Sequence, residues 1–155
     1  MKKKMLSMAI LVTVICYSVC GCRGGQSTES AGIYDYKTEY VGDNSKVVQI
    51  VNGMEYPAGI QYDSIEIQSQ TKPYGLTVYV LEDKEVSQND LFKNAVVTFA
   101  LIDNLSELKY VNSSTNETIA EFNRDSVDEE LEKSGNSSCT EIGESEEALY
   151  NYMSE

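Results

Sequence analysis

Hydrophobic and polar positions divide the chain into three parts. Residues 5–19 form one long apolar run, and residues 23–32 are polar, rich in Gly and Ser, and without periodicity. From Ile33 onward, apolar residues recur at every second position or at every third to fourth position, which is typical of strands and helices respectively. We therefore expect the folded part of the chain to be residues 33–155.

The first half of this region predicts a helix followed by a hairpin. Residues 42–45 supply N-cap chemistry, and apolar residues then follow at helical spacing: Val47, Ile50, Val51 and Met54. Residues 60–70 and 74–81 alternate between apolar and polar positions, with a Lys-Pro turn between them. These two runs predict a pair of antiparallel strands, of which the second is central.

The next stretch predicts a core helix followed by a second hairpin. Ser87 and Asp90 have the spacing of a capping box, and the apolar run 91–105 follows directly. This run predicts the principal core helix, with the alternative that its Val-Val-Thr-Phe centre is a strand. Residues 108–111 and 118–122 are short alternating runs on either side of a polar turn.

The C-terminal part predicts two further helices. An acidic segment, 125–133, is followed by a Ser- and Gly-rich break at 134–138, and an amphipathic segment starts at Ser145. The expected order is α-β-β-α-β-β-α-α. We predict an α+β fold in which two hairpins form a small four-stranded antiparallel sheet, with one face packed on helices.

The N-terminal apolar run has the features of a signal peptide. Three lysines precede it, and its length corresponds to roughly 22 Å of helix, less than the roughly 30 Å hydrocarbon core of a bilayer. It ends in Val19-Cys20-Gly21-Cys22, which resembles the bacterial lipobox. An ordinary secretory signal and an uncleaved anchor are the alternatives.

The lipobox resemblance implies three regions of the chain. Residues 1–21 would be a lipoprotein signal peptide, residues 22–32 a lipidated cysteine followed by a flexible tether, and residues 33–155 a single domain. Diacylglycerol on Cys22 would hold the protein in the lipid bilayer, because two buried acyl chains suffice for stable anchoring. We expect the protein on the outer face of the bacterial cytoplasmic membrane.

Charge narrows the range of partners. The full chain has a net charge of −13, and removing residues 1–21 with their three lysines leaves nine basic and 25 acidic residues, a net charge of −16. Nucleic-acid affinity depends on Lys and Arg neutralising phosphates. We therefore exclude nucleic acid as a partner.

Cysteine and histidine content limits the available chemistry. The chain has no histidine, which removes Ser-His and Cys-His nucleophile pairs and the usual zinc sites. Beyond Cys22 only Cys139 remains, so no disulfide is expected within the mature chain, and an incidental thiol or a redox or dimer-forming role are its two interpretations. Residues 125–130 are rich in carboxylates but lack the Gly and closing Glu of a calcium loop. We predict no metal, no cofactor and no catalytic residues.

Tyrosines near the start of the domain are the candidate binding residues. Three of them lie within seven positions, and a fourth follows the Lys-Pro turn: Tyr34, Tyr36, Tyr40 and Tyr74. Tyrosines in small domains usually fill the margins of the core, and they can also form a platform for a peptide or a sugar.

Three blocks of the sequence carry a resemblance to a known family. Residues 36–47, 72–76 and 94–105 together resemble a domain-of-unknown-function family of Gram-positive bacteria. Its members are small lipoproteins or extracytoplasmic domains, some of them attached to membrane peptidases of the penicillin-sensing BlaR/MecR type. The resemblance covers roughly residues 34–123 and transfers no catalytic residues.

Two functions follow as expectations. The first is a non-enzymatic binding, sensing or accessory module of the cell envelope, whose partner is a membrane or cell-wall protein. The alternative is an envelope hydrolase that acts through a pair of carboxylates.

Overall fold

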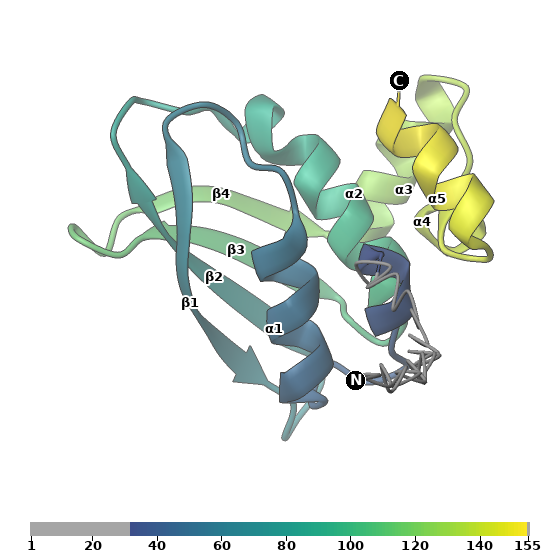
Figure 1. Ribbon diagram of the computed structural model, residues 1–155, viewed down its shortest axis with the longest axis horizontal. Helices are drawn as coiled ribbons and strands as arrows, with labels where there is room; N and C mark the ends of the chain where they lie inside the picture. The colour runs from purple at the N-terminus through teal and green to yellow at the C-terminus, as the bar shows by residue number, and fades with distance from the viewer. Residues whose placement is uncertain (1–31, 155) are drawn as a thin grey trace, which may run out of the picture.

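The computed structural model describes residues 32–154 (Figure 1). The predicted signal peptide, the predicted lipid attachment at Cys22 and the predicted tether up to residue 31 lie outside the described residues. The elements follow in this order: η1 (Ile33–Tyr36), α1 (Asn44–Gly53), β1 (Ile60–Gln68), β2 (Gly75–Glu82), η2 (Gln88–Leu91), α2 (Phe92–Leu101), β3 (Glu107–Asn112), β4 (Thr118–Asn123), α3 (Arg124–Lys133), α4 (Cys139–Ile142) and α5 (Glu146–Ser154).

The four strands form one sheet in the order β1-β2-β3-β4. Both predicted hairpins are confirmed, because β1 pairs antiparallel with β2 and β3 pairs antiparallel with β4. The prediction of an antiparallel sheet is wrong, because β2 and β3 are parallel. The chain leaves the end of β2, passes through η2 and α2, and returns to the start of β2, where the N–H of Glu107 donates to the carbonyl of Tyr74 at 3.1 Å. A helical crossover of this kind joins parallel neighbours, so the sheet is mixed.

The core helix begins as its sequence predicts and ends earlier. Ser87 and Asp90 form the predicted capping box, which starts the short 3-10 helix η2, and α2 continues from it. The alternative of a strand at the centre of this run is wrong. The helix ends at Leu101 because Ile102 takes an extended conformation and forms a parallel β-bridge with Thr38.

Three further segments differ from the expected order. Residues 33–36 form a 3-10 helix, an element that the expected order does not contain. The acidic helix α3 begins at Arg124, one residue before the predicted segment, and the side chain of Asn123 caps it. The predicted break at 134–138 is followed by an additional one-turn helix, α4, because Ser138 and Glu141 form a second capping box.

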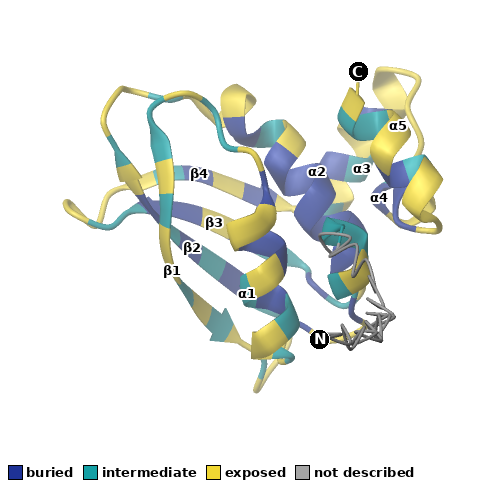
Figure 2. Cartoon of the chain, in the orientation of Figure 1, coloured by how far each residue is buried: buried dark blue, intermediate teal, exposed yellow. Residues whose placement is uncertain are grey.

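The core lies between one face of the sheet and the helices (Figures 1 and 2). The inward side chains of the central and β4 strands are buried: Leu76, Val78, Val80, Leu108, Tyr110, Ala120 and Phe122. Helix α2 is buried from Asn94 to Leu101 and contacts α1, α3, α4 and α5. It is therefore the central element of the helical layer. Within residues 32–154, no helix is long and apolar enough to cross a membrane.

Candidate functional site

An open groove of about 1020 Å³ lies along the free edge of β4. We call it the β4 groove. The buried Leu108 and Phe122 form its base, and Glu107, Lys109, Glu121 and Asn123 form its rim. Gln88, Asn89 and Phe92 form one side of it. The other side belongs to α3 and its C-cap, with Ser126, Val127, Glu130 and Ser134. Strand, core helix and acidic helix therefore all contribute to it.

Aromatic packing fixes the apolar base of the groove. Phe92, the first residue of α2, contacts Phe122 of β4 edge to face, with ring centroids 6.3 Å apart. Phe122 in turn contacts the buried ring of Tyr110 at 6.3 Å in the same manner. Edge-to-face pairs at this separation are favourable, so the side wall and the base are held in one arrangement.

The polar rim of the groove is acidic. Lys109 and Glu121 lie opposite each other on β3 and β4 and form an ion pair at 2.8 Å. The hydrogen bond to Glu121 raises the pKa of Lys109 above its ordinary value. Lys109 is the only basic residue lining the groove, and it stands against three lining carboxylates, those of Glu107, Glu121 and Glu130. The groove thus carries a net negative charge.

Backbone polar groups of every second residue of β4 point toward the groove. The N–H of Arg124 donates to the carbonyl of Ser106 at 3.0 Å, immediately beyond the Glu107–Asn123 pair. Hydrogen-bonded and non-hydrogen-bonded pairs alternate along an antiparallel ladder. The backbone groups of Phe122 therefore point to β3, whereas the N–H and C=O of Glu121 and the N–H of Asn123 point to the open side.

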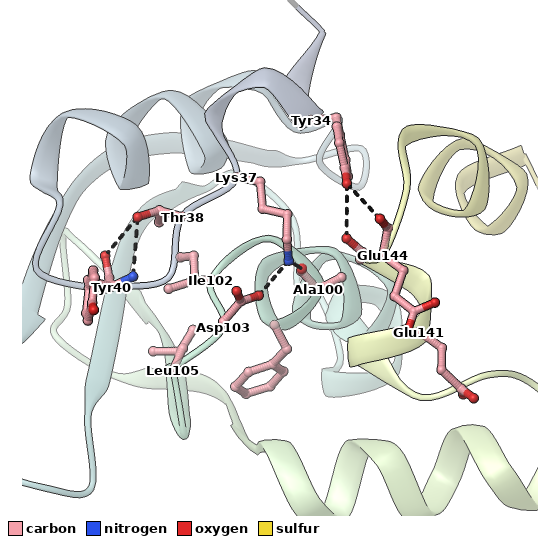
Figure 3. Close-up of polar contacts among 12 residues, drawn as sticks. Tyr34, Lys37, Thr38, Tyr40, Ala100, Ile102, Asp103, Leu105, Glu141 and Glu144 are labelled. Atoms are coloured by element: carbon pink, nitrogen blue, oxygen red, sulfur yellow. Dashed lines mark hydrogen bonds and ion pairs between the residues drawn. The ribbon is translucent and has the colours of Figure 1, made fainter.

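The four tyrosines predicted as a binding platform lie elsewhere. The hydroxyl of Tyr34 donates to the carbonyls of Gly143 and Glu144, at 3.3 and 3.1 Å, and so fastens η1 to the turn between α4 and α5. Tyr36 is partly buried against the core. Tyr40 has 63% of its surface exposed and lies apart from Tyr34, with Lys37 between them (Figure 3).

Tyr74 has a structural role at the end of the sheet. Its carbonyl accepts hydrogen bonds from the N–H groups of Ser106 and Glu107, and the ammonium of Lys72 lies 5.8 Å from its ring centroid. None of the four tyrosines lines the β4 groove. The sequence reasoning missed this groove because its sides come from segments far apart in the chain.

A network of polar contacts joins the N-terminal segment to the end of α2 (Figure 3). The ammonium of Lys37 donates to the carbonyl of Ala100 at 3.0 Å and forms an ion pair with Asp103. The N–H of Val41 donates to Oδ1 of Asn104 at 2.7 Å. A cation at a helix C-terminus stabilises the helix dipole, so these contacts serve the fold.

A second, smaller cavity of about 270 Å³ lies between α2, the loop after α1 and the end of α5. The amide of Asn94, at its inner end, donates to the carbonyl of Glu55 at 2.9 Å. The hydroxyl of Thr98 donates to the carbonyl of Asn94 at 2.7 Å. The polar groups behind this cavity are thus already bonded within the protein.

Cys139 is fully buried at the start of α4. Burial raises the pKa of its thiol, and the neighbouring Asp128 adds to this effect. A buried thiol with a raised pKa is a poor nucleophile. Among residues 32–154, no group of three or more Cys, Asp or Glu side chains is arranged to hold a metal ion.

Comparison with known proteins assigns part of the chain to a protein family. Residues 33–125 match the family described as Domain of unknown function (DUF4825), which confirms the predicted presence of a domain of unknown function. The match contains the base of the β4 groove and its Gln88–Phe92 side, whereas the groove residues of α3 lie beyond it. Searches of curated proteins and of solved structures gave no significant match. Since the matched residues make up more than half of the chain, the protein belongs to the DUF4825 family.

Proposed function

We propose that this protein is a membrane-anchored lipoprotein of the bacterial cell envelope that acts as a non-enzymatic binding module, with the β4 groove as its binding site. The observation that carries the proposal is the groove itself. An open cavity of about 1020 Å³ with an aromatic base and an acidic rim lies beside an uncovered strand edge. Phe92, Leu108, Phe122 and Val127 supply apolar surface among its polar lining residues, and a cleft of this size is the usual form of a binding site.

The N-terminal sequence supports the anchoring part of the proposal. Lipid on Cys22 would be joined to Gly32, where the described chain begins, by nine intervening residues. A fully extended segment of this length reaches about 36 Å at most. Because the mature chain has a net charge of −16, repulsion from anionic headgroups would keep the domain away from the bilayer surface.

The family resemblance supports a membrane or cell-wall protein as the partner. Related domains in small lipoproteins, or attached to penicillin-sensing membrane peptidases, would act beside other membrane proteins. A protein of the membrane or of the cell wall is therefore the partner that we expect for the β4 groove.

The carboxylate hydrolase remains without an observation in its favour among the described residues. Glu121 in the groove is ion-paired with Lys109 at 2.8 Å, and its side chain is 57% exposed. A general acid needs a carboxyl shielded from water, and this environment does not provide one. Binding is therefore the function that we propose.

Site-directed photocrosslinking in intact cells tests the proposal. A photoreactive amino acid replaces Asn89 in the groove, Asn52 on α1 as a matched control, or Tyr40 as the exposed tyrosine. We expect one envelope protein to be captured reproducibly from position 89 and not from position 52. Capture from position 40 alone would move the site to the tyrosine segment. Equal capture from all three positions, or none, would contradict a binding role for the groove.

A further inference from the structure

We propose that β4 binds an extended, basic peptide segment of the partner protein as a fifth strand of the sheet. This inference rests on the proposed function and specifies the chemistry of its partner. Peptides that add to a sheet edge gain affinity from main-chain hydrogen bonds and specificity from pockets for alternate side chains. The β4 groove offers both.

Of the two sheet edges, β4 is the better template. Strand β1 has an irregular register between Tyr62 and Ser64, near its middle, which interrupts a regular row of edge groups. The corresponding irregularity on the β3–β4 ladder lies between Tyr110 and Val111, so residues 120–123 keep regular pairing. Bulges twist an edge away from further pairing. The regular half of β4 is the half that lines the groove.

The main-chain groups needed for strand addition are on the groove side. The N–H of Glu107 donates to the carbonyl of Tyr74, the residue before β2. The backbone groups of the next residue, Leu108, therefore point to β4 and pair with those of Phe122. By the alternation of the ladder, the N–H and C=O of Glu121 and the N–H of Asn123 then point outward, whereas the C=O of Asn123, the N-cap of α3, accepts the first hydrogen bond of that helix. An incoming strand would pair with these two residues.

Charge complementarity indicates the side chains of the peptide. Glu107 on β3 and Glu130 on α3 both line the groove, and the single lining cation, Lys109, is paired with Glu121. A Lys or Arg of the bound segment would meet these carboxylates, while an apolar residue at an alternate position would contact Phe92. A second copy of this chain is a poor occupant, because each mature copy has a net charge of −16.

Peptide binding to the mature, lipid-modified protein in detergent micelles tests this inference. The probes are two synthetic peptides with valine at every second position. Threonine and a charged residue occupy the other positions, and the charged residue is lysine in one peptide and glutamate in the other. We expect the lysine peptide to bind at least about tenfold more tightly than the glutamate peptide. We also expect it to slow hydrogen exchange at the amides of Glu121 and Asn123. Equal binding of the two peptides, or unchanged exchange at both amides, would overturn the inference.

Two matched pairs of variants locate the bound peptide. Glu130→Lys should weaken lysine-peptide binding by about tenfold, whereas Glu132→Lys makes the same charge change on α3 outside the groove lining and should have little effect. Glu121→Pro removes an outward N–H donor and should abolish binding, whereas Glu121→Ala keeps that donor and should retain most of it. Equal effects within either pair would contradict strand addition.

The photocrosslinking experiment separates this inference from the proposed function. If position 89 captures a partner and the lysine peptide fails to protect β4, the protein is a binding module that does not use strand addition. If neither experiment succeeds, both proposals are wrong. A change in the sedimentation of the protein alone on Glu121→Pro would assign the edge to a second copy and overturn the peptide proposal.

Discussion

The guanidinium of Arg124 donates to the carbonyl of Phe99 at 2.7 Å and lies 5.1 Å from the centroid of the same residue's ring. Arg124 is the first residue of α3, and Phe99 lies in the last turn of α2. Two further hydrogen bonds of this guanidinium reach the carbonyls of Ile102 and Leu105, at 2.7 and 2.8 Å. One side chain thus satisfies carbonyls at the end of the core helix and fixes the start of the helix that forms one side of the β4 groove.

Removing this side chain should destabilise the whole fold. Arg124→Ala leaves three carbonyls without their charged donor and is expected to lower the free energy of unfolding by about 2 to 4 kcal/mol. Arg124→Lys should recover only part of the loss, since an ammonium lacks the planar fork of donors. Urea unfolding measures these changes. Lys133→Ala, at an exposed ion pair, is the control and should change stability by less than about 0.5 kcal/mol.

Gly143 is required by the close approach of the α4–α5 turn to α2. A Cβ on this residue would lie 2.1 Å from the carbonyl oxygen of Ala100, so the backbone would have to move. Gly143→Ala is expected to lower the unfolding free energy by about 2 kcal/mol or more. Gly53 in α1 has nothing within 4 Å of the same position, and Gly53→Ala should be neutral or stabilising by up to about 1 kcal/mol. Similar losses for both variants would refute this explanation.

The capping box at η2 predicts a dependence of stability on pH. The hydroxyl and N–H of Ser87 donate to Oδ2 of Asp90 at 2.6 and 2.9 Å, which lowers the pKa of Asp90 from its ordinary value of 3.8. A carboxylate with a lowered folded-state pKa stabilises the fold fully above its unfolded-state value and loses that contribution as pH falls through the folded-state value.

The stability difference between the native protein and Asp90→Asn should therefore be constant above about pH 5 and diminish as the pH falls below 3.8. Urea unfolding at a series of pH values measures it. In a Ser87→Ala background the pH-dependent part should shrink, because the hydroxyl donor is absent. A difference that grows toward low pH would contradict the assignment.

The lipid anchor predicts the location of the protein. Cys22→Ala should release the protein into the medium or leave an uncleaved precursor, as measured by membrane fractionation and by the mass of the chain. Cys20→Ala is the matched control, because it changes the tolerant position of the predicted lipobox. A Cys22→Ala protein that stays membrane-bound with a mature mass would show that the anchoring proposal is wrong.

Local chemistry explains which elements could be predicted. Asp43 caps α1, and Ser87 with Asp90 starts η2, because a capping side chain bonds to backbone only three positions away. The two hairpins were also predictable, since each joins strands that are adjacent in sequence. The helix α4 was missed, although Ser138 and Glu141 have the spacing of a capping box, because one turn is too short for an apolar period.

The contacts around the predicted tyrosines show what sequence patterns leave open. Tyr34 and Tyr40 are close in sequence, yet Tyr34 bonds to the α4–α5 turn and Tyr40 is exposed on another part of the surface (Figure 3). The environment of Tyr34 depends on contacts with residues more than a hundred positions away, whereas the side chain of Tyr40 stays exposed. Periodicity contains no information on contacts at that separation.

The starts of α1 and η2, the two hairpins and the apolar faces follow from the sequence alone, because all of these depend on side chains within a few residues of one another. Only the tertiary structure decided that β2 and β3 are parallel, since that pairing depends on where α2 returns the chain. It also decided the β4 groove, which brings Phe92, Phe122 and Val127 together from three elements. Chain entropy opposes such distant contacts, and the burial of the common core around α2 compensates for it.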